Sequence, residues 1–426
     1  MPGTDLIPLF DTLLSTIRPP EGDPEAPFQM LVSSVDYNEF VGRIGIGRIQ
    51  NGVARVGEEV QVCDWHNPDL KMRGRLTKLY DFQANGRQPC DNITAGDIVA
   101  FSGLPDVTIG NTLCSPSQVE PLPFVKINDP TVEMTFSVND SPLAGREGKF
   151  VTSRQIRERL YRETLKDVSL RVTDLEGATD SFNVAGRGEM SLSILIETMR
   201  REGYEFQVSP PRVLYQMIDG KKCEPIEEMT VDCPQEYSGT VIELATKRKG
   251  TLTNMETNGD RTRLEFTIPS RGIIGLRSNM LTATAGEAIM THRLKGFEPW
   301  TGEIEMRVNG SIISGETGTA YAYSIDKLQD RGRFFISPME QVYEGQVIGE
   351  HTRQNDITVN VTKAKQLTNM RASGSDEKTS IAPPKVFSLE EALEYIKEDE
   401  YVEVTPHAMR LRKILLNETD RKRASK

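Results

Sequence analysis

The sequence is poor in the residues that build disulfides, metal sites and membrane spans. Its five cysteines are an odd number, lie far apart and form no CxxC pair, and its four histidines occur singly. We therefore expect neither a disulfide framework nor a metal centre. No apolar run approaches the roughly 18 residues that span a bilayer. From these absences we expect a cytosolic protein that does not bind a membrane.

A phosphate-binding loop is also missing. Such a loop needs the pattern GxxxxGK followed by Ser or Thr, because only glycine backbones wrap phosphates closely while the lysine supplies charge. The nearest fragment, GREGKF at 145–150, has the wrong spacing and no hydroxyl after its lysine. The fragment GRGE at 186–189 is too short for a dinucleotide site, and we expect it to turn the chain into a helix. Asp64 and His66 could form a catalytic base pair, but no nucleophile is identifiable and an Asn-Pro turn follows directly. We therefore expect a surface turn there and no enzyme activity.

The charge is distributed unevenly. The formal net charge is −11, which argues against a protein that coats nucleic acid through bulk charge. Residues 405–426 nevertheless carry seven basic and two acidic side chains. An acidic body with a basic end can still bind anions locally.

The 426 residues are enough for several domains. Residues 5–17 have the apolar spacing of a short amphipathic helix and are stopped by Arg-Pro-Pro. Short strands separated by turn residues then predict a closed β-barrel, with the strands expected at 29–35, 41–50, 59–64, 71–80 and 98–102.

Two following segments have the same order of elements. The first, ending near 208, contains a capping box at Thr152 and Gln155 and a second helix with an apolar face at 192–199, and we interpret it as βαββαβ. After Pro210-Pro211 the order repeats without sequence identity, with a strand at 228–233 and a helix at 238–247. The fold class is therefore multidomain, with a β-barrel, two α+β ferredoxin-like βαββαβ domains and a mixed, mostly-β C-terminal domain. The C-terminal domain should contain one clear helix that starts at a capping box of Ser388 and Glu391.

Two clusters of basic residues are candidate nucleic-acid contacts. Lys247, Arg248 and Lys249 end a helix, where cations favour the dipole and Gly250 caps the chain, so a purely structural role is equally open. The second cluster lies in a polar stretch that gains nothing by collecting like charges, and it can follow a phosphate backbone without reading sequence. Its candidate residues are Arg353, Lys363, Lys365, Asn369, Arg371, Ser373, Gly374 and Lys378. Asn369 and Ser373 would add hydrogen bonds, and Gly374 would allow close backbone approach.

Several stretches resemble translational GTPases. The second, β-barrel domain of that family resembles residues 41–49 with 56–59, and a turn of its third domain resembles GRGEM at 186–190. Its fifth domain resembles short stretches at 224–225, 234, 237–239 and 248–250. The stretches LQDRG (328–332), YEGQVIG (343–349) and LTNMRASG (367–374) are similar to the C-terminal domain of the BipA family, also called TypA. On this basis we divide the chain into a remnant of a GTPase domain (1–23), a β-barrel domain II (24–122), a ferredoxin-like domain III (123–210), a ferredoxin-like domain V (211–300) and a BipA-type C-terminal domain (301–426).

The resemblance implies a ribosome-bound factor in large-subunit assembly and in stress or low-temperature growth. It implies docking in the elongation-factor site, with rRNA, the aminoacyl-site tRNA and ribosomal proteins as partners, and we expect a monomer. The family carries an N-terminal GTPase domain, of which residues 5–17 resemble only the last helix. We therefore expect this chain to be a fragment and expect GTP and Mg²⁺ to bind the missing domain.

Two other interpretations stay open at this point. A LepA-like or elongation-factor-G-like protein would act on tRNA movement, but a translocase of the latter type should carry another domain between the two βαββαβ units, where only residues 210–225 are available. An unrelated hydrolase with an unrecognised site is the other alternative.

We predict that this chain does not bind GTP, since the glycine cradle and its lysine are absent. Titration with a fluorescent GTP analogue in the presence of Mg²⁺ should give no saturable signal. Saturable, magnesium-dependent binding would contradict this prediction.

Overall fold

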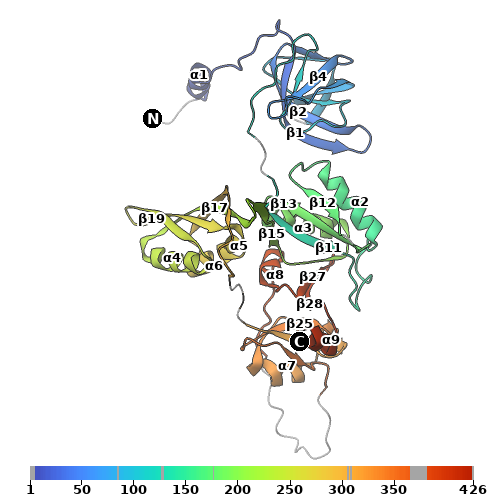
Figure 1. Cartoon of the computed structure of the whole chain (residues 1–426), viewed down its shortest axis with the longest axis vertical. Coiled ribbons are helices and arrows are strands. Elements are labelled where there is room, and N and C mark those ends of the chain that lie inside the picture. The colour runs from blue at the N-terminus through green and yellow to red at the C-terminus, as the bar shows by residue number, and fades with distance from the viewer. Residues whose placement is uncertain are drawn as a thin grey trace, which may run out of the picture. The chain divides into compact units, whose positions relative to one another are not determined.

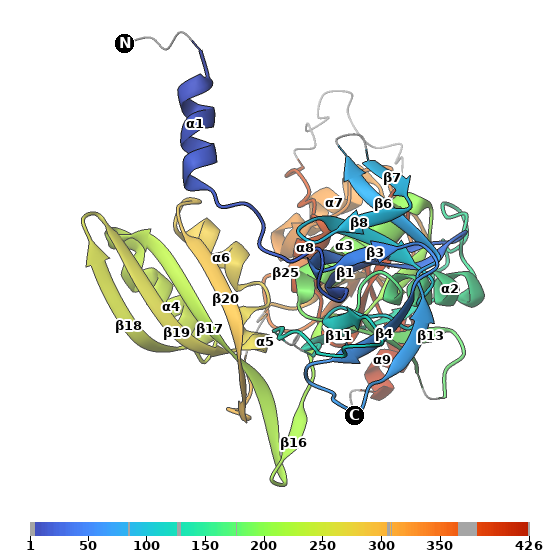
Figure 2. The same cartoon turned by 90° about the horizontal axis from the view of Figure 1, so that it is seen from above.

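A computed structural model describes residues 5–83, 86–125, 129–175, 177–304, 307, 309–364 and 381–424. The chain forms two compact units, residues 1–128 with 161–169, and residues 129–160 with 170–426. Figures 1 and 2 show the elements of both units. In the described part of the chain, no helix is long and apolar enough to cross a bilayer.

The first unit is an antiparallel sheet curled around one core. It is preceded by α1 (Ile7–Thr16), none of whose residues is buried. The hydrogen-bonded path of the sheet runs β5-β4-β10-β1-β2-β9-β6-β7, and β3 pairs separately with β8. The strands are β1 (Gln29–Asn38), β2 (Gly42–Asn51), β3 (Val53–Arg55), β4 (Glu59–Asp64), β5 (Met72–Arg75), β6 (Lys78–Gln83), β7 (Gly86–Cys90), β8 (Asn92–Thr94), β9 (Ile98–Ser102) and β10 (Asn111–Cys114).

The prediction of a closed barrel needs correction. Among the described residues β5 and β7 are the two ends of the strand path, so the ring of hydrogen bonds is open. Side chains such as Val60, Val99 and Leu113 still fill one shared interior. Two glycines let β2 lie against its neighbours, since a Cβ at Gly47 would come 2.0 Å from the Leu31 carbonyl oxygen, and one at Gly45 would come 2.3 Å from the Phe101 ring.

The second unit contains both expected βαββαβ segments. The first is β11 (Val132–Ser137), α2 (Ser153–Thr164), β12 (Arg171–Asp174), β13 (Ser181–Gly186), α3 (Glu189–Glu202) and β14 (Phe206–Val208). The second is β17 (Lys221–Pro234), α4 (Ser238–Lys247), β18 (Thr251–Asn258), β19 (Arg261–Pro269), α5 (Ser270–Ile273) with α6 (Leu276–Ala283), and β20 (Ile289–Pro299). Their sheets have equivalent orders, β12-β13-β11-β14 and β18-β19-β17-β20. The two segments therefore share one order of strands in their sheets.

Short elements connect these segments and build the C-terminal part. They are β15 (Arg212–Val213), β16 (Gln216–Ile218), η1 (Gln235–Tyr237), β21 (Ser311–Ser314), β22 (Gly318–Thr319), α7 (Ala322–Leu328), η2 (Gln329–Arg331), β23 (Gly332–Phe334), β24 (Gln341–Val342), β25 (Gln346–His351), β26 (Ile357–Val359), α8 (Leu389–Tyr395), β27 (Glu400–Val404), β28 (Met409–Lys413) and α9 (Glu418–Ala424). Helix α8 begins with the predicted capping box, in which Ser388 accepts from the Glu391 amide and the Glu391 carboxylate accepts from the Ser388 amide.

One sheet crosses from the first βαββαβ segment into the C-terminal part. Strand β14 pairs with β27, with Phe206 opposite Val404 and Val208 opposite Val402. The sheet order then continues through β28, β25, β21 and β26. The sequence did not predict this pairing, because the two strands lie almost two hundred residues apart and each is too short to indicate its partner.

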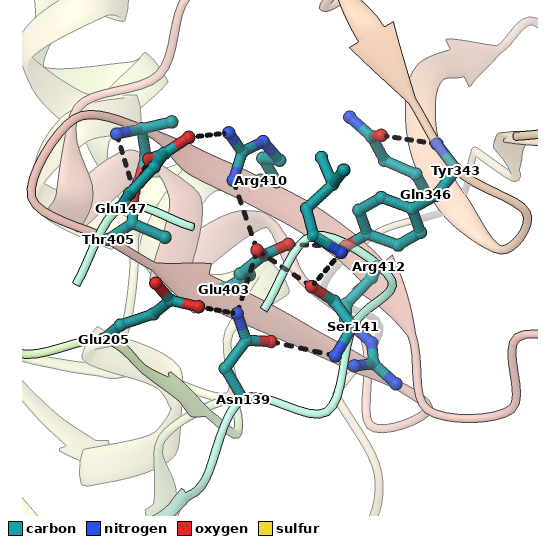
Figure 3. Close-up of polar contacts among 12 residues, drawn as sticks. Asn139, Ser141, Glu147, Glu205, Tyr343, Gln346, Glu403, Thr405, Arg410 and Arg412 are labelled. Carbon is teal, nitrogen blue, oxygen red and sulfur yellow. Dashed lines mark hydrogen bonds and ion pairs between the residues drawn. The ribbon is translucent and has the colours of Figure 1, made fainter. Parts of the chain in front are cut away.

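A buried polar cluster lies at this junction (Figure 3). The carboxylate of Glu403 is fully buried and accepts hydrogen bonds from Asn139 (3.0 Å), Ser141 (3.0 Å), Tyr343 (2.6 Å) and Arg410 (3.2 Å). Burial, and then the neighbouring Glu403 charge, raise the pKa of Tyr343 well above its ordinary value, so its hydroxyl stays a donor. A buried carboxylate with this many donors is satisfied only in one relative position of the two segments.

The fragment GREGKF, which resembles part of a phosphate-binding loop, is folded around an internal carboxylate. Glu205 accepts the amides of Gly145 (2.7 Å) and Gly148 (2.9 Å) and the side-chain amide of Asn139 (2.8 Å). A Cβ at Gly148 would lie 2.4 Å from the Glu205 Cβ, so glycine is required there for packing. Its two glycine amides are thus used within the protein and do not fit a nucleotide phosphate.

We predict that Glu403→Ala destabilises the second unit by about 3–5 kcal/mol, because it leaves the buried Tyr343 and Ser141 hydroxyls without this acceptor, at about 1–3 kcal/mol each, and removes one of the two carboxylates on half-buried Arg410. Tyr343→Phe removes one donor and should cost only about 1–2 kcal/mol. Urea unfolding measures both losses. The exposed Glu398 gives a matched control, since Glu398→Ala should stay within about 0.5 kcal/mol of the parent chain. A loss below about 1 kcal/mol for Glu403→Ala would show that this cluster does not hold the junction.

Candidate nucleic-acid interface

The structure describes two of the eight candidates in the C-terminal cluster. Arg353 and Lys363 are both exposed. The other six lie outside the described residues, namely Lys365, Asn369, Arg371, Ser373, Gly374 and Lys378. The proposal for those six therefore rests on the sequence.

The described chain on both sides of residues 365–380 is attached beside α7. On one side the Ser324 hydroxyl donates to the Lys363 carbonyl oxygen at 2.6 Å. On the other side the Ala382 amide donates to the Gln329 side chain at 3.3 Å, and the Lys385 amide donates to the Phe334 carbonyl oxygen at 2.9 Å. Both flanks of the segment are thus fixed to α7 and the turn that follows it.

Arg353 belongs to the same region. The amide of its neighbour Thr352 donates to the Arg331 carbonyl oxygen at 3.0 Å, and Thr352 and Ile381 line one cavity of about 450 Å³. Strand β23 pairs with β25, which places Arg333 opposite Glu350. The fold therefore brings Arg353 near the flank that begins at Ile381.

Three further cations lie on these elements and were missed by sequence reasoning. Lys327, Arg331 and Arg333 are exposed on α7, η2 and β23. Together with Arg353 and Lys363 they form what we call the α7 cation group. The described acids beside the group are Asp326 next to Lys327, Asp330 next to Arg331, and Glu350 opposite Arg333, so five cations face three acids and the group keeps an excess of positive charge. The pairing of β23 with β25 could not be found from the spacing of charges, because these strands are separated by a loop.

The candidates at the end of α4 differ from one another in the structure. Lys247 pairs with Glu243 at 2.7 Å on the exposed face of the helix. Arg248 is half-buried and donates to the Ile274 carbonyl oxygen at 2.9 Å. Lys249 is exposed. Of the three cations, Lys249 is the one that remains a straightforward candidate for a phosphate contact.

The way this helix ends also differs from the prediction. The left-handed residue is Lys249, with φ of 64°, and not Gly250. The amide of Gly250 donates to the Ala245 carbonyl oxygen and that of Lys249 to the Thr246 carbonyl oxygen, which is the Schellman pattern. Glycine is needed at 250 because a Cβ there would lie 2.8 Å from the Ala245 carbonyl oxygen.

The basic C-terminal end is largely neutralised. Fully buried Lys413 contacts Asp356 (2.7 Å), Asp399 (2.8 Å) and Glu400 (2.9 Å), and buried Arg412 pairs with Asp140 (2.5 Å). Further pairs join Arg410 to Glu147, Lys422 to Glu418 and Arg423 to Asp420. The expectation that this end binds anions is therefore wrong for Arg410, Arg412 and Lys413, because carboxylates from other segments enclose them. Lys422 and Arg423 pair only with exposed acids of their own helix and stay candidates.

Arg248 faces a group of titratable side chains instead of solvent. These are Glu189 at the start of α3 and Glu394 of α8, and the hydrogen-bonded pair of Glu227 and His292 lies near Glu189. Burial, followed by the charge of Glu394, raises the pKa of Glu189 to about 7, and burial raises the pKa of Glu394. The hydrogen bond between the His292 ring and the accepting Glu227 carboxylate raises the pKa of His292. Glu189 Oε2 is buried without a hydrogen-bond partner among the described residues.

Comparisons with known proteins agree with the arrangement described above. Residues 309–418 match the family model described as TypA/BipA C-terminal domain. Residues 27–116 match elongation factor G domain 2, and residues 221–308 match the elongation factor G C-terminus. The last two matches fit several translation factors, whereas the first distinguishes among them.

Full-length relatives decide the family. The chain is 47% identical to a Synechocystis protein over 96% of this chain and 68% of the relative, and 45% identical to a Bacillus subtilis protein over 98% and 68%. A Haemophilus influenzae protein is 47% identical over 99% of this chain and 68% of the relative. All three are named large ribosomal subunit assembly factor BipA. The chain belongs to the BipA family. The resemblance found in the sequence is thereby confirmed, and the alternatives based on LepA or elongation factor G are not needed.

The BipA relatives are about half as long again as this chain, which spans 68% of their length. The described residues contain no group of three or more His, Cys, Asp or Glu side chains that could hold a metal ion. With the glycine amides at 145 and 148 bound to Glu205, the fragment GREGKF does not fit a nucleotide phosphate. That a GTPase domain precedes this part stays a prediction.

We predict that the second unit becomes less stable between pH 5 and pH 8. A carboxyl whose pKa is raised on folding contributes stability that is complete below its unfolded pKa, about 4.5, and is lost as the pH rises through about 7. Glu189→Gln removes this titration. Between pH 5 and pH 8 the free energy of unfolding of the variant should therefore fall less than that of the parent chain. The difference should reach up to about 3 kcal/mol, at roughly 1.4 kcal/mol per pKa unit. Urea unfolding at both pH values checks this. Exposed Glu236→Gln should follow the parent chain, and identical pH profiles for Glu189→Gln and the parent would refute the prediction.

Proposed function

We propose that this chain is the ribosome-binding part of a BipA-type factor that acts in assembly of the large ribosomal subunit. The observation that carries this proposal is the identity of 45–47% over nearly the whole chain to relatives named for that role. The complete protein would be a translational GTPase, with GTP and Mg²⁺ bound in a domain that precedes this part. It would act in the cytoplasm, associated with the ribosome, and support stress or low-temperature growth.

The contacts proposed are with rRNA, the aminoacyl-site tRNA and ribosomal proteins. The α7 cation group supports an RNA contact, because five exposed cations gather where both flanks of residues 365–380 are attached. Phosphates neutralised by such side chains fix position without reading sequence. The negative charge of the chain as a whole keeps non-specific RNA binding weak, so that local groups determine where it docks.

The finer parts of the proposal rest on the sequence. They include the five-part division at 1–23, 24–122, 123–210, 211–300 and 301–426, the monomeric state, and docking in the elongation-factor site. The six candidates between 365 and 378 also remain in the proposed RNA contact, with Lys249 as a second contact.

The experiment is sedimentation of the chain with purified large ribosomal subunits at a series of salt concentrations. We predict that changing Arg331, Arg353 and Lys363 together to Ala weakens binding and flattens the slope of log affinity against log salt by about 2–3, at 0.7–0.9 per lost phosphate contact. Thermal stability should change little, because all three side chains are exposed.

The matched control preserves charge, with Arg331→Lys, Arg353→Lys and Lys363→Arg in one chain. It should keep the salt slope of the parent. If the parent chain binds and the Ala variant shows the same dependence of affinity on salt, the α7 cation group is not part of the interface. If the parent chain does not bind at all, the proposed function itself is contradicted.

A further inference from the structure

A tight hairpin precedes the second βαββαβ segment and has no role in the contacts described so far. Strand β16 pairs with the first residues of β17, with Ile218 opposite Lys221 and Met217 opposite Lys222. The two turn residues are Asp219 and Gly220, with φ of 50° and 74°. Positive φ at both positions is the type I′ geometry that Asp-Gly favours and that matches the strand twist. Figure 2 shows this hairpin extending away from β18 and β19. The Asp219-Gly220 turn therefore determines the geometry of this hairpin.

The tip of the hairpin exposes apolar side chains beside cations. Met217 is 70% exposed and Ile218 is 40% exposed. Lys221 and Lys222 on the opposite strand are also exposed. Strand β17 continues from the hairpin into the sheet with β19 and β20, so the sheet holds the hairpin at its base while the apolar and basic side chains of the tip stay exposed.

The base of the hairpin carries two aromatic rings with cations over them. Lys222 Nζ lies 3.8 Å from the centre of the Tyr215 ring and 5.4 Å from that of Trp300, and the Arg271 guanidinium lies 5.8 Å from the Trp300 ring. These four side chains, which we call the stacking platform, come from three separate parts of the chain. Both rings stay about two-fifths exposed, at 42% for Tyr215 and 39% for Trp300. The platform is therefore assembled but not covered.

Buried contacts hold the platform in place. The Trp300 amide donates to the Lys222 carbonyl oxygen at 3.1 Å, which ties the ring to β17. Arg271 donates to the fully buried carboxylate of Glu224, with Nη2 at 3.1 Å from Oε1, and that carboxylate also accepts the Thr301 amide at 2.9 Å. The charge of Glu224 is thus compensated inside the fold, and its partner Arg271 is fixed beside the ring.

The charge and shape of this surface fit unpaired RNA. The adjoining hollow carries both signs of charge, with Glu303, Glu394 and Glu398 beside Arg212, Arg271, Arg307 and Lys397. The excess of positive charge lies on the hairpin itself, where exposed Lys221 and Lys222 outnumber exposed Asp219. Aromatic rings accept unstacked bases, while nearby lysines bind the phosphates between them. A paired duplex keeps its bases inside the stack and cannot use the rings in this way.

We propose that the hairpin tip and the stacking platform together bind a single-stranded RNA segment, with bases on Tyr215 and Trp300 and phosphates on Lys221 and Lys222. The proposal deepens the proposed ribosome binding by naming a second RNA contact, separate from the α7 cation group. It needs no bound nucleotide and no catalytic step.

The first experiment measures binding of the chain to a fluorescently labelled, mixed-sequence single-stranded RNA of twelve nucleotides, with the duplex of the same sequence for comparison. Trp300→Leu should weaken single-strand affinity roughly ten-fold, within the 1–3 kcal/mol expected for loss of one base stack. Trp300→Phe keeps a ring and should lose much less. Changing Lys221 and Lys222 to Ala should flatten the salt slope by about 1–1.5, at about 0.7 per contact on a single strand. Equal affinities for the single strand and the duplex, or unchanged affinity in Trp300→Leu, would overturn the proposal.

The second experiment covers the case in which Trp300→Leu does not fold. A photo-cross-linking residue placed at Met217, which is far from the core, should cross-link to rRNA when the chain is bound to large ribosomal subunits. Cross-links confined to ribosomal proteins would assign the hairpin to a protein partner and overturn the RNA proposal, as would bound chain without any cross-link. A chain that binds the twelve-nucleotide RNA through the platform but does not sediment with subunits would instead contradict the proposed function and leave this inference standing.

Discussion

The pairing of β14 with β27 is the constraint on which the second unit depends. It converts two segments that are far apart in the sequence into one sheet and removes a free edge from each. Burying Glu403 at this junction is tolerated only because four donors reach its carboxylate. The register of the pairing therefore determines the position of β28 and, through β25, that of the α7 cation group.

The contact of the second βαββαβ segment has a different chemistry. Glu189, Glu394 and Arg248 bring two carboxyl groups to one guanidinium, and one Glu189 oxygen has no partner in the described part of the chain. Such an arrangement is favourable when one carboxyl is protonated and less so when both are charged. The contact around Glu189 therefore titrates near neutral pH.

Local signals in the sequence were enough to predict the elements, but not how distant segments meet. The capping boxes at Thr152 and Ser388 and the apolar face of α3 gave the correct helices, because these signals lie within one turn. The sheet formed across β14 and β27 was missed because strand partners are chosen by tertiary packing. The sequence also suggested that Arg248 was a surface cation, since nothing near it indicates that α8 would supply Glu394. For the six candidates at 365–378 the structure gives no test.

The distribution of cations shows why a local count of charge is a poor guide to a binding surface. The end of the chain is the most basic stretch of the sequence, yet Arg410, Arg412 and Lys413 are neutralised by carboxylates brought from elsewhere. Buried ion pairs of this kind specify geometry and leave little field outside the protein. Cations that can meet a polyanion are those that the fold leaves exposed, such as Lys249, the α7 cation group and the lysines of the β16 hairpin. Because these lie on separate elements of an acidic chain, each can add affinity only where a phosphate comes within reach, so docking depends on the matching of several sites and not on total charge.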